Sequence, residues 1–435
     1  MFSHSPTSSS FPRRGRGLFA CCLALALLVG LIPSTAQGEL DMNPQIDALV
    51  TALEGKRVGL LTNYSAVDQQ YRYISDRLAA DPDVDLVAFF APEHGLRGEH
   101  QAGDGDPDYT DPLTGLPVFS LYGSRKAPTP EQLEMIDVLV FDIQDVGSRF
   151  YTYVWSMTYA MEAAAAHDTA FVVFDRPNPI GLDKVEGVPN PFDAGLIGRK
   201  WAGAPFGVAT RHGMTAGEIA LLVNNEWMDP KVDLQVVAVP GLTRAMSFDE
   251  TGYPWVFPSP NMPTIDTALV YPGMCALEGA NASEGRGTTR PFELTGAPFI
   301  DPNALAEALN AKNLPGVRFR PASFTPTFDN FAGQVCHGVQ VHVTDASQFQ
   351  AVRTGLEVVK AMVDAYPEQI TLASNLSRLM GVSNLHERIR TESVDAIMAE
   401  WTEPMAQFMT LREKHLIYPE SGTFSGIIIS GSKGE

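Results

Sequence analysis

The segment VLVFDI (138–143) decides the fold class of this chain. It is almost entirely apolar, and its length is that of a strand buried on both faces. Strands of the same kind are predicted at 57–63, 84–91 and 170–175, with a shorter one at 117–122. Helical patterns lie between them, at 74–80, 130–136, 155–166 and 217–227. The alternation predicts a parallel sheet with helices on both faces, in a doubly wound, Rossmann-like α/β domain over residues 37–240.

The second half of the chain has a less regular pattern. A strand at 232–239 either closes the first sheet or opens the next domain, and a loop rich in Pro and Gly follows at 253–298, with a helix near 264–276. Paired strands are predicted at 317–324 and 338–343, and helices at about 347–365 and 397–415. We therefore expect a smaller α+β domain over residues 241–435. No GxGxxG follows the first strand, so nothing indicates a dinucleotide cofactor.

Residues 1–36 have the order of segments of a secretory signal peptide. Arg13, Arg14 and Arg16 precede an uncharged apolar run at 18–32, and small residues follow at 34–36. The run has about fifteen residues, fewer than the roughly 20 that span a bilayer. We expect an exported protein, periplasmic or secreted, with no stable membrane insertion after signal removal. The alternative is a retained N-terminal anchor.

Charge and cysteine content narrow the function classes. Removal of residues 1–36 takes away three arginines and no acid, so the net charge falls from −20 to −23, which disfavours nucleic acid as a partner. Cys21 and Cys22 leave with the signal, while Cys275 and Cys336 either form a disulfide or stay as buried thiols. No CxxC or Cys/His spacing indicates zinc, and no metal site is predicted.

Polar residues follow five predicted strands. Because ligands bind outside the carboxyl ends of the strands in a doubly wound sheet, these residues are expected to form one site. The candidates are Asn63, Glu93, His94, Tyr122, Asp142, Asp145, Arg149, Tyr151, Arg176 and Asn178.

Glu93 is the leading candidate for a catalytic acid. It directly follows FFAP (89–92), and apolar neighbours raise the pKa of a carboxyl group. A raised pKa is what a general acid needs to protonate a leaving glycosidic oxygen. The alternative is that Glu93 caps the following turn or pairs with His94 or Arg97.

Structural roles compete with catalytic ones for the other acids. One of Asp142 and Asp145 is expected to cap the turn at Gly147 or to hold Arg149. The other would orient a hydroxyl group, bind a metal or act as a base. Asp175 and Arg176 have the arrangement of an ion pair at a strand end.

A second polar cluster occupies residues 258–293 and supplies Asn261, Asn281, Glu284 and Arg286. Glycines on both sides of Arg286 allow close approach of a ligand to the backbone while presenting one guanidinium. The Walker Gly-Lys-Ser/Thr ending is missing, so this is no P-loop. Arg286 or Arg290 is expected to bind a carboxylate, or else Arg286 joins the two domains.

Seven segments of the chain resemble one family. They are FFAPEHGLRGEHQAG (89–103), TGLPVFSLYG (114–123), DVLVFDIQDVGSRFYTYVW (137–155), FDRPNPIG (174–181), RHGMTAGE (211–218), PSPNMPTIDTALVYPG (258–273) and EGANASEGRGTTRPFE (278–293). In content and order they are similar to the NamZ-type exo-β-N-acetylmuramidases. The resemblance implies a Rossmann-like domain, a second domain and a cleft between them. It also implies release of terminal N-acetylmuramic acid from the non-reducing ends of peptidoglycan fragments, without an organic cofactor.

The resemblance points to Glu93 as the catalytic carboxylate. A second acid, such as Asp142, Asp145 or Glu284, would orient the 2-acetamido group in a substrate-assisted route or activate water in an inverting one. Arg149, Arg176 or Arg286 would hold the lactyl carboxylate, and Tyr122 or Tyr151 would stack on the sugar.

Two rival functions fit parts of the sequence. A periplasmic sugar- or muropeptide-binding protein would share the signal peptide, the acidic surface and the two α/β domains. A metal-dependent hydrolase would use Glu93, His94, Asp142 and His212 as ligands.

Overall fold

The computed structural model describes residues 39–98, 101 and 107–431. The predicted signal peptide and the alternative anchor lie outside the described residues. Among those that are described, no helix is long and apolar enough to cross a membrane.

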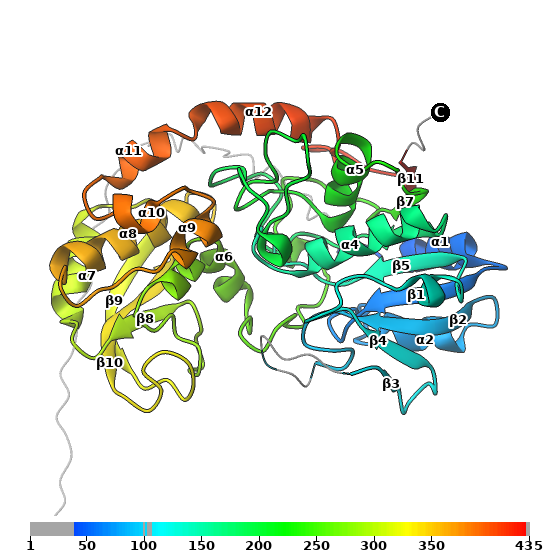
Figure 1. Cartoon of the computed structure of the whole chain (residues 1–435), viewed down its shortest axis with the longest axis horizontal. Coiled ribbons are helices and arrows are strands. Elements are labelled where there is room, and N and C mark those ends of the chain that lie inside the picture. Colours follow the sequence, from blue (N-terminus) through cyan, green and yellow to red (C-terminus); the bar gives the residue numbers. More distant parts are fainter. Residues whose placement is uncertain (1–38, 99–100, 102–106, 432–435) are drawn as a thin grey trace, which may run out of the picture. The chain divides into compact units, whose positions relative to one another are not determined.

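The chain forms two sheets (Figure 1). The strands of the larger one are β1 (Arg57–Thr62), β2 (Asp85–Ala91), β3 (Tyr109–Thr110), β4 (Pro117–Ser120), β5 (Val138–Asp142), β6 (Ala170–Phe174), β7 (Leu234–Val237) and β11 (Ile428–Ser430). Their order is β11-β7-β6-β5-β1-β2-β4-β3. The six central strands pair in parallel, and the short edge strands β3 and β11 are antiparallel to their neighbours. The prediction of a mostly parallel sheet is confirmed, and the strand near 232–239 closes it.

Strand β5 is buried on both faces, as its composition predicts. Val138 and Val140 belong to one apolar cluster, whereas Leu139 and Phe141 belong to the other. All four side chains are 0% exposed. Because successive side chains of a strand point to opposite faces, both faces of the sheet must be covered by other elements.

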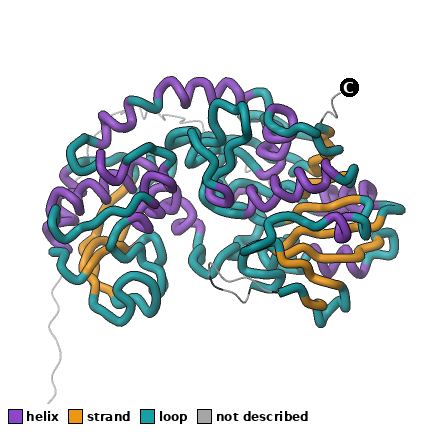
Figure 2. The backbone as a smooth tube through the Cα atoms, in the orientation of Figure 1, coloured by secondary structure: helices purple, strands orange, loops and turns teal. Residues whose placement is uncertain are grey.

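Helices from several parts of the chain supply that cover. They are α1 (Asn43–Leu53), α2 (Ile74–Ala80), α3 (Pro130–Leu133), α4 (Tyr153–Ala166) and α5 (Ala216–Glu226). Residues of α1 and α2 share a cluster with Val138 and Val140, while residues of α4 and α5 share one with Leu139 and Phe141. At the carboxyl ends of the central strands the chain continues into long loops (Figure 2).

The second sheet has three antiparallel strands in the order β8-β10-β9: β8 (Leu294–Ala297), β9 (Val317–Phe324) and β10 (Cys336–Val343). The second half of the chain also contains the helices α6 (Ile265–Met274), α7 (Pro302–Ala311), α8 (Ala351–Ala365), α9 (Asn375–Met380), α10 (Leu385–Arg388), α11 (Val394–Ala399) and α12 (Thr402–Glu413). The predicted helix at 397–415 is wrong as a single element, because α11 ends at Ala399 and the buried Trp401 precedes α12. The sequence patterns did not predict α1, α7, α9, α10, β3, β8 or β11.

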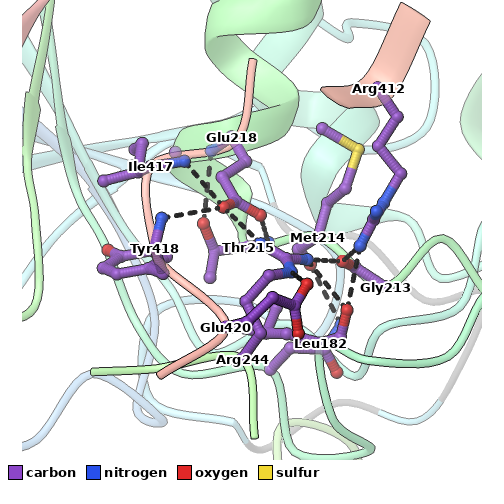
Figure 3. Close-up of polar contacts among 12 residues, drawn as sticks. Leu182, Gly213, Met214, Thr215, Glu218, Arg244, Arg412, Ile417, Tyr418 and Glu420 are labelled. Atoms are coloured by element: carbon purple, nitrogen blue, oxygen red, sulfur yellow. Dashed lines mark hydrogen bonds and ion pairs between the residues drawn. The ribbon is translucent and has the colours of Figure 1, made fainter. Parts of the chain in front are cut away.

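The segment after α12 returns to the large sheet through a buried polar network (Figure 3). The Glu218 carboxylate accepts hydrogen bonds from the backbone N–H of Ile417 at 2.9 Å and from Arg244 at 2.7 Å. Arg412 donates to the carbonyl oxygens of Leu182 and Gly213, to which Arg244 also donates. One buried carboxylate and shared carbonyl oxygens thus hold two buried guanidinium groups, and β11 follows to pair with β7.

Asp175, at the end of β6, is tied to the same returning segment. Its carboxylate accepts hydrogen bonds from the hydroxyl groups of Tyr418 and Thr215, both at 2.6 Å, and from the backbone N–H of Gly217 at 2.8 Å. Complete burial nevertheless raises the pKa of Asp175 to about 6.

This raised pKa predicts a stability that depends on pH. Since the pKa of Asp175 is higher in the folded than in the unfolded chain, its contribution is fully present below pH 3.8 and is lost as the pH rises through about 6. Between pH 4 and pH 8 the free energy of unfolding of the parent protein should fall by about 3 kcal/mol relative to that of Asp175→Asn. Denaturant titrations across this range measure the difference, and parallel stability curves would contradict the assignment.

Helices α6 and α8 touch backbone to backbone. A Cβ atom built on Gly355 would lie 2.0 Å from the carbonyl oxygen of Gly273, and one built on Gly273 would lie 1.8 Å from the carbonyl oxygen of Ala351. The two glycines therefore allow a helix approach that no larger residue permits. This contact fixes α6, the helix that leads into Cys275 and Glu278.

The contact between Gly273 and Gly355 predicts that the usual preference of a helix for alanine over glycine is reversed at Gly355. Alanine normally stabilises a helix relative to glycine by about 1 kcal/mol. Gly355→Ala should instead destabilise the protein by about 2 kcal/mol or more, because the two helix backbones must separate. Thermal and denaturant unfolding measure the effect, and a stabilised variant would show that the helices do not pack this closely.

Candidate functional site

A pocket of about 540 Å³ collects the side chains that can carry chemistry. It is lined by residues of both halves of the chain: Glu93, His94, Gln101, Tyr122, Phe150, Tyr151, Thr152, Tyr153, Ile197, Ser259, Asn261, Met262, Tyr271, Cys275, Glu278, Arg286, Phe292, Phe328, Asp329 and Leu379. Of the sequence-predicted site residues, the structure thus brings six together here: Glu93, His94, Tyr122, Tyr151, Asn261 and Arg286.

Glu93 lies just beyond the carboxyl end of β2 and is 9% exposed. The hydroxyl of Thr152, which precedes α4, donates a 2.9 Å hydrogen bond to its Oε2. His94 has a φ of 74°, in the left-handed region that few residues other than glycine adopt. A backbone conformation of this kind persists only where the surrounding structure holds it in place. The turn that carries Glu93 is therefore fixed by its surroundings.

Aromatic rings form much of the pocket wall. Tyr271 packs edge to face against Phe150, Tyr151 and Phe292, with ring centroids 5.2, 6.0 and 4.7 Å apart. Tyr151 packs in the same way on Tyr153. Burial raises the pKa of Tyr151, Tyr153 and Tyr271 well above the ordinary value, so all three keep their hydroxyl protons at neutral pH. The wall therefore offers apolar surface with hydrogen-bond donors, which suits a sugar ring.

Arg286 joins two acids next to the aromatic wall. Its guanidinium lies 2.7 Å from Glu278 Oε1 and 2.9 Å from Glu284 Oε1, and it covers the ring of Phe292 at 4.9 Å. These two carboxylates raise the pKa of Arg286 despite its burial. Glu278 lines the pocket, while Glu284 is buried behind it.

Arg149 lies behind the pocket wall and not in it. Its buried guanidinium donates to the carbonyl oxygens of Ile197 at 3.1 Å and Leu379 at 2.6 Å, both of which belong to pocket-lining residues. No carboxylate among the described residues pairs with it, and burial lowers the pKa of Arg149 to about 10. Arg149 thus joins two segments far apart in the sequence.

Asp142 and Arg176 are also outside the pocket lining. Arg176 Nε lies 2.6 Å from Asp142 Oδ1, and both side chains are at most 4% exposed. The neighbouring strands β5 and β6 place these two strand ends side by side. The predicted pair of Asp175 with Arg176 is wrong, because Asp175 is instead bonded to Tyr418 and Thr215.

The remaining predicted residues make local structural contacts. Asp145 accepts a hydrogen bond from the backbone N–H of Gly147 at 2.7 Å. This is the turn-capping role that the sequence offered for one of the two acids. Asn178 bridges Ile180 and Met214, Asn281 bridges Gln369 and Thr371, and Asn63 accepts from Ser65. None of these lines the pocket.

Neither a disulfide nor the ligand set of the rival metal-dependent hydrolase is present in the described part of the chain. Cys275 and Cys336 are both buried free thiols. No group of three or more His, Cys, Asp or Glu residues in that part is placed to hold a metal ion. Asp142 and His212 do not join Glu93 and His94 at the pocket.

Several pocket residues do not follow a strand end and could not be predicted from the strand pattern. Tyr271 and Glu278 lie within the segments 258–273 and 278–293, which it quoted without assigning a role to either side chain. For Cys275 the sequence offered a disulfide or a buried thiol, and neither alternative placed it at a site. Asp329 lies on the loop between β9 and β10, where no pattern distinguishes it.

The fold and the pocket define a class: a mixed α/β protein with an aromatic, carboxylate-bearing pocket formed by both halves of the chain. Comparison with known families then assigns it. Residues 58–266 match the family model for the N-terminal part of exo-beta-N-acetylmuramidase NamZ, and residues 269–418 match the model for its C-terminal part. The chain belongs to the NamZ family, which confirms the resemblance and the prediction of a glycoside hydrolase.

Individual relatives agree with this assignment. The chain is 48% identical over 370 residues to the peptidoglycan beta-N-acetylmuramidase NamZ of Bacillus subtilis strain 168, covering 84% of this chain and 88% of that protein. Two solved DUF1343 family proteins of Bacteroides fragilis share the fold, with TM-scores of 0.78 and 0.66 at 34% and 29% identity. Each match covers 87% of this chain and 98% of the other.

The contacts of Asp142 predict a structural role that a stability measurement can test. Asp142→Asn leaves the buried Arg176 charge without its partner, so the free energy of unfolding should fall by about 3–5 kcal/mol. The control is Asp137→Asn, which breaks the half-exposed pair with Arg57 and should cost less than about 1 kcal/mol. Equal effects in the two variants would overturn the structural assignment of Asp142.

Proposed function

We propose that the protein is an exported exo-β-N-acetylmuramidase. It releases terminal N-acetylmuramic acid from the non-reducing ends of peptidoglycan fragments, and Glu93 is its general acid. The family assignment and the Bacillus subtilis relative support the reaction. The observation that carries the role of Glu93 is its position, because it is held by Thr152 in a pocket with an aromatic wall.

Two features of the Glu93 site support a role in proton donation to a glycosidic oxygen. Its Oε2 is oriented by the Thr152 hydroxyl, and the turn at His94 fixes its backbone. A donor held in this way contributes about 10²–10⁴-fold to the rate of such a reaction. As the bond between C1 and the leaving oxygen breaks, the proton of Glu93 passes to that oxygen.

Neutral polar groups are available for the rest of the sugar. The side-chain Nδ2 of Asn261 and the hydroxyl of Tyr151 are buried at the pocket and make no hydrogen bond to another described residue. Burying a polar group without a partner is costly, so both suit a ligand that supplies hydroxyl or acetamido groups.

The acidic lactyl group of the sugar is favoured by Arg149. This buried guanidinium has no carboxylate partner in the described part of the chain, and its partners Ile197 and Leu379 line the pocket. Because the wall contains little water, the positive charge of Arg149 is weakly screened there. It can therefore attract an anion in the pocket without touching it. Arg286, in contrast, is already paired with Glu278 and Glu284.

The proposal includes the organisation of the chain. Residues 1–36 serve as the export signal, residues 37–240 form a Rossmann-like domain, and residues 241–435 form the second domain, with the pocket in a cleft between the two. Strand β11 crosses this division. Residues 428–430 follow the second domain in sequence, but they pair with β7 of the first domain.

The test is the release of chromophore from a 4-nitrophenyl β-N-acetylmuramide. The protein should hydrolyse this substrate and leave the matching β-N-acetylglucosaminide intact. Glu93→Gln should lower kcat/KM by about 10²–10⁴-fold, since the amide gives up no proton.

Glu54→Gln, an exposed substitution beyond α1, is the matched control and should retain full activity. Folded protein that cleaves neither sugar would contradict the muramidase proposal and leave a sugar-binding protein as its replacement. Full activity of Glu93→Gln would contradict the acid role alone.

A further inference from the structure

Three carboxylates among the described residues line the pocket, and only one of them has been assigned a role. Besides Glu93, the lining residues include Glu278 and Asp329, whereas Asp142, Asp145 and Glu284 are not among them. Hydrolysis of a 2-acetamido glycoside needs a second group, which either activates water or assists the acetamide. This group must reach the sugar, so the choice among the residues that the structure describes lies between Glu278 and Asp329.

Glu278 is the better positioned of the two. Its side chain is 24% exposed, and it is bound by Arg286 at 2.7 Å and by the Cys275 thiol at 3.4 Å. Asp329 is exposed on a loop, where it accepts a hydrogen bond from the adjacent backbone N–H of Asn330. Both partners bind the same oxygen, Oε1. A carboxylate fixed by a guanidinium and a thiol is closer to the preorganised state that catalysis requires.

The backbone under Glu278 is also fixed. Glu278 belongs to a 3-10 helix, η3 (Cys275–Gly279), that continues directly from α6. A Cβ atom on the adjacent Gly279 would lie 2.5 Å from the backbone nitrogen of Leu376, so α9 packs tightly against this turn. The Gly273–Gly355 contact holds α6 on the other side.

A buried acid supports Glu278 from behind. Glu284, with 2% of its side chain exposed, binds one nitrogen of Arg286, and Arg286 presents another to Glu278. Phe292 underlies the guanidinium. Burial raises the pKa of the Cys275 thiol well above its ordinary value. The thiol therefore keeps its proton and donates to Oε1 of Glu278, the oxygen that Arg286 also binds.

We propose that Glu278 is the second catalytic carboxylate, with Arg286 and Glu284 as its positioning residues. The inference rests on the proposed muramidase function. Glu93 gives its proton to the leaving oxygen as the bond from C1 breaks, and Glu278 takes the proton of the group that forms the new bond to C1. That group is water in an inverting reaction. In a substrate-assisted reaction it is the acetamido oxygen, and the proton comes from the acetamido nitrogen as the neutral oxazoline forms.

Leaving-group dependence separates the two carboxylates. A 2,4-dinitrophenyl muramide needs little protonation of its leaving oxygen, so this substrate should restore most of the activity of Glu93→Gln. Glu278→Gln should lose about 10²–10⁴-fold in kcat on both the 4-nitrophenyl and the dinitrophenyl substrates, with a change in KM of only a few fold. A merely structural role of Glu278 would not produce this contrast.

The comparison variants are Asp329→Asn and Glu284→Gln. Asp329→Asn should stay within about tenfold of the parent protein, and Glu284→Gln should fall between it and Glu278→Gln because it acts through Arg286. Thermal unfolding of each variant checks that it is folded. If Glu278→Gln does not fold, Glu278→Asp provides the same test, because a carboxylate that is one methylene too short should lower kcat on both substrates.

The anomeric form of the first product, read by NMR, distinguishes the source of the proton. The α-anomer indicates that Glu278 activates water, and azide should then rescue Glu278→Ala as the α-glycosyl azide. The β-anomer indicates that the proton comes from the acetamido group.

A folded Glu278→Gln within tenfold of an active parent, or a larger loss in Asp329→Asn, would overturn the assignment of Glu278. An inactive parent protein would instead overturn the proposed function.

Discussion

The burial of the central strands on both faces is the constraint on which the rest of the structure depends. Val138 and Val140 face one apolar cluster and Leu139 and Phe141 face the other, so helices must cover the whole sheet. Polar side chains can then reach solvent or a ligand only beyond the strand ends. Glu93 follows β2 at such an end, and Thr152 precedes α4 after the end of β5. The chemistry of the pocket therefore begins where the apolar strands stop.

The opposite wall comes from a different part of the chain, and three sets of contacts hold it in place. Arg149 bonds to Ile197 and Leu379, the glycines of α6 and α8 touch, and the Tyr153 hydroxyl donates to the carbonyl oxygen of Pro258 at 2.5 Å. The segment after α12 adds a further connection through Ile417 and Glu218 (Figure 3). The hydroxyl of Tyr418 adds another through Asp175. Buried charges in this protein thus serve mainly to fix segments that are distant in sequence, which leaves Glu93 and Glu278 to face the pocket.

The strand pattern was predictable from the sequence because period and composition report burial directly. The same logic placed Glu93, His94, Tyr122 and Tyr151 at one pocket. It failed for Asp142 and Arg176, since a sequence does not reveal that two strand ends are neighbours and will neutralise each other. It also missed Glu278, because the position of a 3-10 turn relative to Glu93 depends on helix packing far along the chain. Short elements such as β11 carry too few residues for any periodicity to mark them.

The central claim is that the pocket removes a terminal N-acetylmuramic acid. The most direct measurement is mass spectrometry of the products from two defined peptidoglycan oligosaccharides, one ending in N-acetylmuramic acid at its non-reducing end and one ending in N-acetylglucosamine. An exo-β-N-acetylmuramidase releases free N-acetylmuramic acid from the first and does not cleave the second, and this is the result that we predict. Release of N-acetylglucosamine, cleavage at internal bonds, or no product from either would contradict it.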